Sequence, residues 1–178
     1  TKFLKALYQE ELLRFNYSQR QWQWNMQQIQ ERRITDNVVE LMAQKITKLP
    51  AATQTVLKLA ASIGAVFDIN TLAIIYEHAP PVTFQHLWEA LVEGLILPLD
   101  EHYRLIDVAA ELGLQEVSWF KFLHDRIQQA AYSLIPEAQK PTIHLQIGRL
   151  LLKNTPVASL EERIFEIVAQ LNVGRSLI

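Results

Sequence analysis

The spacing of apolar residues divides the first part of the chain into helical and extended segments. Apolar side chains at helical intervals over residues 2–13 predict a helix, and the residues after it, with a turn-like stretch at 16–19, predict a β-hairpin. From Asp36, a favourable N-cap residue, a second apolar face predicts a helix that reaches Leu49 and stops at Pro50. The chain is thus predicted to begin with a helix, a hairpin and a second helix.

The middle of the chain has the pattern of three helices and a small sheet. One helix is predicted from Pro50 to Gly64, a second begins after Asp68 as its cap, and a third spans about 82–93, after the break at 79–81. Short apolar segments at 95–99, 103–106 and 117–122 then predict three strands. Three helices followed by a small sheet is the order of a winged helix.

The last part of the chain is again predicted to be helical. The apolar positions of a first helix are Ile127, Ala130, Ala131, Leu134 and Ile135, and those of a second are Ile143, Ile147, Leu150 and Leu151. The letters "SLEE" from Ser159 form a capping box for a third helix. These helices have the pattern expected at the start of an α-solenoid, although no fixed repeat period is visible. The predicted fold class is therefore mainly α.

Composition narrows the classes of function. The chain has 178 residues, 49% of them hydrophobic, which suits one domain or two small ones. Its net charge of −2 lacks the cationic excess typical of nucleic-acid binding, and without cysteine it forms neither disulfides nor thiolate metal sites. No membrane span or signal peptide is visible, so we expect a cytoplasmic protein, and the start at Thr1 suggests a piece of something larger.

The triplet His124-Asp125-Arg126 resembles enzymatic motifs only superficially. A kinase catalytic loop needs the order H-R-D, an Asn five positions after the Asp, and a later D-F-G, and none of these is present. A His-Asp metal site needs further ligands on both sides, but no aspartate follows Asp125. None of the five glycines precedes a lysine, as a phosphate-binding loop requires. We therefore predict no catalytic residues, no metal and no cofactor in this segment.

Two interpretations of His124 remain open. It lies three residues before Ile127, which belongs to the apolar face of the predicted helix. The ring of His124 should therefore project from the start of this helix, near the face that packs against the rest of the domain. There the imidazole can bond a backbone group, which is the structural interpretation that we favour, or can meet a phosphate from outside. Asp125, in the first turn, complements the positive end of the helix dipole.

The amino-acid sequence disfavours DNA binding, which is the usual role of a winged helix. The presumptive recognition helix, "VTFQHLWEALVE", contains no Lys or Arg and carries Glu89 and Glu93. The four tryptophans are not interleaved with basic residues, so we interpret them as core or interface anchors rather than as base-stacking groups: Trp22, Trp24, Trp88 and Trp119.

Seven segments, in order and at similar spacing, resemble the middle of very large bacterial signalling proteins, often cyanobacterial. The segments are "FLKALYQEELLRFNYSQRQWQWN", "DNVVELMAQKITKLP", "TQTVLKLAASIGAVFD", "ALVEGLILP", "FKFLHDRIQQAAYSLIP", "HLQIGRLLL" and "FEIVAQLN". In those proteins a serine/threonine kinase domain precedes a STAND-type ATPase of the AAA+ superfamily, a helical region, a GAF domain and a histidine kinase of the two-component type. The resemblance covers nearly the whole chain.

The resemblance implies three parts and a regulatory role. Residues 1–34 would be the tail of the ATPase core or its lid, 35–123 the helical lid and winged helix, and 124–178 the start of a solenoid. In related STAND proteins a winged-helix histidine touches the ADP phosphate in the inactive state, which makes His124 the nucleotide-sensing candidate, with Arg126 as a second contact. ATP or ADP and Mg would bind in the neighbouring ATPase.

The partners implied are the ATPase and kinase domains of the same chain, and neither nucleic acid nor membrane. The segment itself would be non-catalytic and would couple the nucleotide state of the ATPase to kinase output. The alternative from another class is a helical scaffold that binds a protein partner and has no nucleotide coupling.

Overall fold

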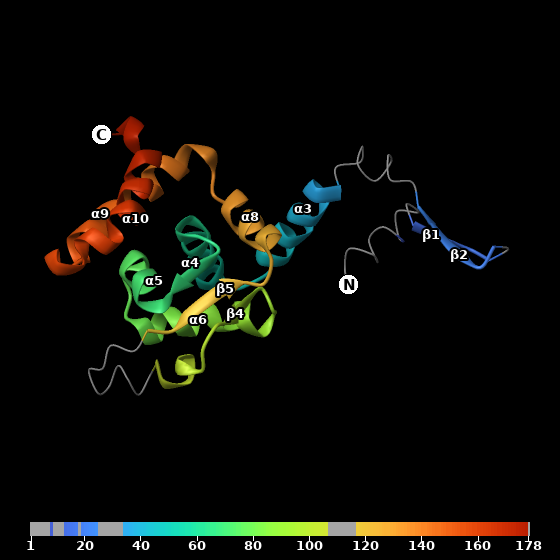
Figure 1. Ribbon diagram of the computed structural model, residues 1–178, viewed down its shortest axis with the longest axis horizontal. Coiled ribbons are helices and arrows are strands. Elements are labelled where there is room, and N and C mark those ends of the chain that lie inside the picture. The colour runs from blue at the N-terminus through green and yellow to red at the C-terminus, as the bar shows by residue number, and fades with distance from the viewer. Residues whose placement is uncertain (1–7, 9–12, 18, 25–33, 107–116, 178) are drawn as a thin grey trace. The chain divides into compact units, whose positions relative to one another are not determined.

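The computed structural model describes residues 8, 13–17, 19–24, 34–106 and 117–177 (Figure 1). The chain divides into two compact units, residues 1–41 and residues 42–178. The described residues form seven α-helices, a β-hairpin and a three-stranded antiparallel sheet, which confirms the mainly helical fold class. None of these helices is long and apolar enough to cross a membrane.

The N-terminal unit contains the predicted hairpin. Strands β1 (Leu13–Asn16) and β2 (Gln21–Trp24) are antiparallel, with Phe15 opposite Trp22. The two rings meet edge to face with centroids 5.3 Å apart, a geometry favourable for aromatic pairs. Arg20 takes the left-handed backbone conformation (φ 51°) in the connecting turn. Of the helix predicted over 2–13, only Tyr8 and Leu13 are described, and Leu13 belongs to β1.

Helix α3 (Ile34–Ile46) begins earlier than the sequence pattern indicates. Asp36 lies inside its first turn instead of at the N-cap, so that prediction was wrong. An aspartate suits both places, because a carboxylate in the first turn also interacts favourably with the helix dipole. The helix ends at Ile46, three residues before the predicted end. Its last turn belongs to the C-terminal unit, where Ile46 is fully buried and Lys45 Nζ lies 2.7 Å from both the backbone and the side-chain oxygen of Glu93.

The C-terminal unit contains the predicted winged helix. Helix α4 (Ala51–Ile63) is followed by β3 (Val66–Asp68), α5 (Ile69–Tyr76), α6 (Pro80–Val92), β4 (Ile96–Pro98) and β5 (Trp119–Phe122). The strands are antiparallel in the order β3-β5-β4. The three helices and the three-stranded sheet are those of the predicted winged helix, but the first strand lies between the first two helices and not after all three.

The ends of these helices agree largely with their cap residues. Gly64 caps the end of α4, and the Asp68 carboxylate accepts a hydrogen bond from the Thr71 backbone N–H at 2.8 Å, which confirms both predictions. The break at Ala79–Pro81 was placed too late, since Ala79 is the N-cap and two prolines open α6. Proline suits these positions because the first N–H groups of a helix have no intrahelical partner. Gly94 follows α6 with φ 64° and forms the turn into β4.

One predicted strand is absent from the sheet, and one observed strand was missed. Residues His102–Leu105 form a 3₁₀ turn where a strand over 103–106 was expected, so that prediction was wrong. The Asp100 carboxylate turns the chain there, because one oxygen accepts from the His102 backbone N–H and the other from that of Trp119. Strand β3 has three residues, too few for an alternating pattern to be visible in the sequence.

The core of the winged helix lies between the sheet and the three helices. Along β5, Phe120 and Phe122 are buried while Trp119 and Lys121 are exposed, as strand alternation requires. Phe67 of β3 packs against both buried phenylalanines, with ring centroids 6.0 and 5.7 Å apart. Phe84 of α6 lies against Phe120 with ring centroids 6.0 Å apart, so aromatic side chains also connect the sheet to a helix.

Three helices complete the unit: α8 (Asp125–Ser133), α9 (Lys140–Asn154) and α10 (Leu160–Val173). Ile147, Leu151 and Ile167 of α9 and α10 form a buried cluster with Ile75 of α5. In Figure 1 the pair formed by the orange α9 and the redder α10 lies beside the green α5. Ser159 stands at the N-cap of α10 as predicted, but its side chain makes no capping hydrogen bond, so the capping box is not formed.

Candidate functional site

The predicted nucleotide-sensing corner lies at the start of α8. His124 is its N-cap residue, with an extended backbone and an exposed side chain. Its Nδ1 atom accepts a hydrogen bond from the Arg126 backbone N–H at 3.3 Å. Because an accepting nitrogen carries no proton, the neutral ring holds its proton on Nε2. The cap thus leaves one N–H donor that is not used by it.

Arg126 shares this end of the helix but has a partner of its own. Its Nη1 atom donates to the Gln129 side-chain oxygen at 2.7 Å, one helical turn further along α8. Asp125 is exposed in the first turn, where its charge complements the helix dipole. The structure therefore brings His124 and Arg126 to one corner, and their role in nucleotide sensing stays a prediction. Within the described part of the chain, no three His, Asp or Glu residues are grouped to hold a metal.

Two residues beyond Arg126, a glutamine ties α8 to α4. The last carbonyls of an α-helix have no partner within the helix and need one from elsewhere. At the end of α4, the Ala60 carbonyl accepts from the Gly64 N–H, and the Ala61 carbonyl accepts from the Gln128 side-chain amide at 3.2 Å. The sequence pattern around the HDR triplet did not identify Gln128.

A second glutamine donates a hydrogen bond to the next carbonyl of α4, that of Ser62. Gln170 of α10, only 6% exposed, donates from Nε2 to the Ser62 carbonyl at 3.0 Å. Its other amide atom, Oε1, lies 2.5 Å from Nδ1 of the buried His144 on α9. Because Oε1 can only accept, His144 Nδ1 carries a proton.

His144 continues this arrangement to α8. Its Nε2 atom lies 2.9 Å from the Tyr132 hydroxyl, which donates to it in the neutral ring. We call Gln128, Tyr132, His144 and Gln170, with the carbonyls of Ala61 and Ser62, the α4-end network. It joins four helices through buried or partly buried polar groups, and such groups are costly to leave unpaired.

Two residues of the network stand out in the sequence as polar residues on helix faces that are otherwise apolar, although the patterns of apolar residues did not single them out. Gln170 lies three residues after Ile167 and one before Leu171, on the face predicted to be apolar, and His144 is next to Ile143. A polar residue at a buried helical position needs a partner. The signal does not, however, say which helix supplies that partner.

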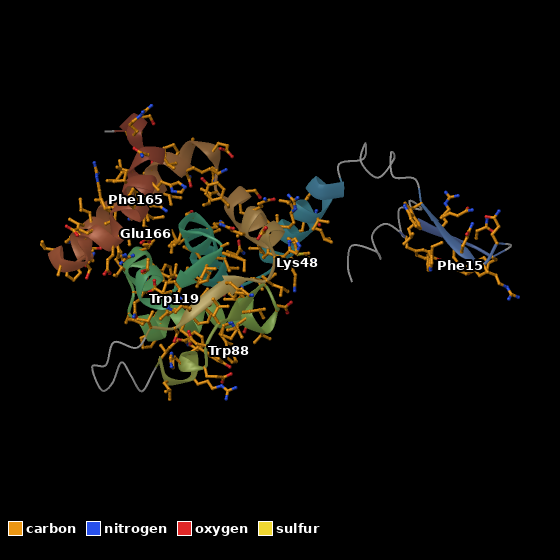
Figure 2. All side chains as sticks on the ribbon, in the orientation of Figure 1. Phe15, Lys48, Trp88, Trp119, Phe165 and Glu166 are labelled. Carbon is orange, nitrogen blue, oxygen red and sulfur yellow. The ribbon has the colours of Figure 1, made fainter. Side chains whose placement is uncertain are left out.

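The tryptophans do not belong to the core. Trp22, Trp24, Trp88 and Trp119 are 49, 59, 46 and 44% exposed, so the core alternative for them was wrong. Trp88, labelled in Figure 2, lines an open groove of about 660 Å³ with Phe84 and Val82 of α6 and Pro50. Nearby, the Tyr76 hydroxyl lies 2.9 Å from His86 Nδ1, and burial raises the pKa of Tyr76.

Comparison with known proteins gives one informative similarity. No protein-family model matches the chain, and no solved structure matches it significantly. A hybrid signal transduction histidine kinase of Dictyostelium discoideum, named G, is 31% identical over 212 residues. The alignment includes 99% of this chain and 6% of that protein. This chain is distantly homologous to a segment of a signalling histidine kinase.

Proposed function

We propose that the chain is a non-catalytic regulatory segment of a multidomain signalling kinase. The observation that supports this most is the 31% identity to a hybrid signal transduction histidine kinase over nearly all of the chain. The similarity continues through both the winged helix and the C-terminal helices, which supports one inherited unit. From the resemblance, we further propose that this segment belongs to a larger bacterial protein that carries a serine/threonine kinase domain and a histidine kinase domain.

The signal that the segment responds to would be the nucleotide bound by an adjacent STAND-type ATPase. That ATPase would hold ADP, or ATP with Mg. His124 supports this proposal because it is exposed and its cap bond leaves Nε2 as a donor for a phosphate oxygen. Arg126 would add a positive charge once its side chain leaves Gln129.

The α4-end network would carry a change at His124 to the C-terminal helices. Gln128 and Tyr132 lie in the helix that His124 caps, and they connect it to α4 and to His144 of α9. Gln170 then connects α10 to α4. A shift of α8 that breaks these bonds would leave buried groups unpaired, so the helices are expected to move together. Two packings of this unit would then follow the ADP and ATP states.

The alternative function is a helical scaffold that binds a protein partner without nucleotide coupling. Exposed apolar side chains on two helices favour it: Val92 of α6 is 61% exposed and Phe165 of α10 is 84% exposed. Large exposed apolar groups are typical of interaction surfaces when they gather in a patch.

Kinase output of the full protein distinguishes the two functions. Autophosphorylation is measured after loading with ADP or with a non-hydrolysable ATP analogue, in the wild type and in a variant whose phosphate-loop lysine is replaced by alanine. The switch predicts output that depends on the loaded nucleotide and is lost in the variant. Equal output in all samples, or a full protein without a phosphate loop, contradicts the switch and supports the scaffold.

A further inference from the structure

One face of α10 carries an unusual stripe of exposed residues. Glu161, Phe165, Val168 and Asn172 recur at intervals of four, three and four residues, so they lie along one side of the helix. Arg175 continues this spacing three residues after Asn172, beyond Gly174, the C-cap of the helix, and opens the 3₁₀ turn Arg175–Leu177. We call these five residues the α10 stripe.

The stripe is apolar in its middle and oppositely charged at its two ends. Phe165, labelled in Figure 2, is 84% exposed and Val168 is 41% exposed. The opposite side of the same helix is packed, with Ile167 in the buried cluster. Glu161 and Arg175 are exposed, and neither has an ion-pair partner among the residues that the structure describes. Glu166, beside Phe165, turns to Arg163 at 3.0 Å and leaves the stripe uncharged there.

We infer that the α10 stripe is a homotypic interface, in which α10 packs antiparallel against α10 of a second copy. A two-fold axis through Val168 places residues equally far before and after it at the same level. Glu161 precedes Val168 by seven residues, about 10 Å along the helix axis, and Arg175 follows Val168 by seven, two residues past the end of the helix. Each Glu161 is therefore level with Arg175 of the other copy, and two ion pairs form.

The apolar middle fits the same arrangement. Phe165 stands three residues before Val168, and Asn172 stands four after it. Each ring is then placed between Val168 and Asn172 of the second copy, where its exposed surface is removed from water. A parallel pair would instead bring Glu161 next to Glu161 and Arg175 next to Arg175. The charges thus select a second copy in the antiparallel orientation.

The contact of one helix pair is smaller than a standard interface of about 1,600 Å². We therefore expect a weak dimer whose population rises with concentration. Sedimentation equilibrium of the 178-residue chain over a wide concentration range measures this directly. Phe165→Ser should abolish association, whereas Val92→Ser, at an exposed apolar residue of α6, should leave it unchanged.

Charge reversal tests the register. Glu161→Arg and Arg175→Glu each create two like-charged contacts and should weaken the dimer about tenfold. The double variant restores opposite charges and should return the dissociation constant to within about threefold of the wild-type value. Circular dichroism checks that each variant is folded, and the exposed positions of both residues favour this.

Three outcomes would overturn the inference. A chain that stays monomeric at every concentration measured would show that the α10 stripe does not bind a second copy. A dimer that survives Phe165→Ser would place the interface elsewhere. A dimer that the single reversals weaken but the double variant does not restore would exclude the antiparallel register. Because nucleotide plays no part in these measurements, they are independent of the proposed switch.

Discussion

Replacing Gln170 by methionine tests the α4-end network most simply. Methionine keeps the length and approximate shape of glutamine but has no amide, so the substitution removes the bonds to the Ser62 carbonyl and to His144 Nδ1. Both remaining groups are buried, His144 at 6% and Ser62 at 5% exposure, and cannot turn to water without local opening. The substitution should therefore lower the free energy of unfolding.

The size of the effect follows from the two groups that lose a partner. A buried donor or acceptor without a hydrogen bond costs about 1–3 kcal/mol, so two such groups cost about 2–6 kcal/mol. Burial of the more apolar methionine offsets about 1–2 kcal/mol of this. The middle of the first range, about 4 kcal/mol, less the middle of the second, about 1.5 kcal/mol, leaves an expected net loss of about 2.5 kcal/mol, which lowers the melting temperature by roughly 5–10 °C for a unit of this size.

Urea denaturation followed by circular dichroism measures this loss. Gln146→Met is the matched control, because Gln146 lies on α9 but is exposed, and its unfolding free energy should change by less than about 0.5 kcal/mol. Combining Gln170→Met with His144→Phe removes both members of one bond, so the double variant should lose less than the sum of the single losses. A Gln170→Met midpoint equal to that of the control would refute the network as a stabilising connection.

Three further predictions follow from the packing and from the sequence. Gly174→Ala should lower the unfolding free energy by about 1–3 kcal/mol in the same urea assay, since its Cβ would lie 2.6 Å from Leu145 Cβ and 2.8 Å from the Pro141 carbonyl; an unchanged midpoint would contradict that close contact. The isolated chain should neither hydrolyse ATP nor bind it tightly, and turnover that is lost in His124→Ala would argue against a partial module. Fluorescence anisotropy should detect no binding to duplex DNA, and a salt-sensitive micromolar affinity would count against this.

The ends of helices could be predicted where the residue type at the end is favoured at only one position of a helix terminus. Gly64 and Asp68 were placed correctly because a glycine after an apolar face and an aspartate before one have strong positional preferences. Asp36 was misplaced because the same residue type also suits the first turn. Strand β3 and the 3₁₀ turn at His102–Leu105 depend on partners far along the chain, which a local pattern does not include.

The candidate site could be predicted only in part, for a similar reason. The position of His124 at the start of α8 follows from local periodicity, and the structure has it there as the N-cap residue. The pairing of Gln128 and Gln170 with two adjacent carbonyls of α4 joins residues 67 and 108 positions apart. No spacing within one helix contains that information. The sequence indicates only that polar residues stand on faces that should be apolar.

The central proposal, that this segment couples the nucleotide state of an adjoining ATPase to kinase output, is tested most directly at His124 by calorimetric titration of ADP. The samples are the larger protein segment that includes the adjoining ATPase, as wild type and as His124→Ala. Losing one hydrogen bond to a phosphate costs about 1–3 kcal/mol, so we predict ADP binding about tenfold weaker or more in the variant. An unchanged ADP affinity with a lowered melting temperature would contradict the claim and leave His124 as the structural cap of α8.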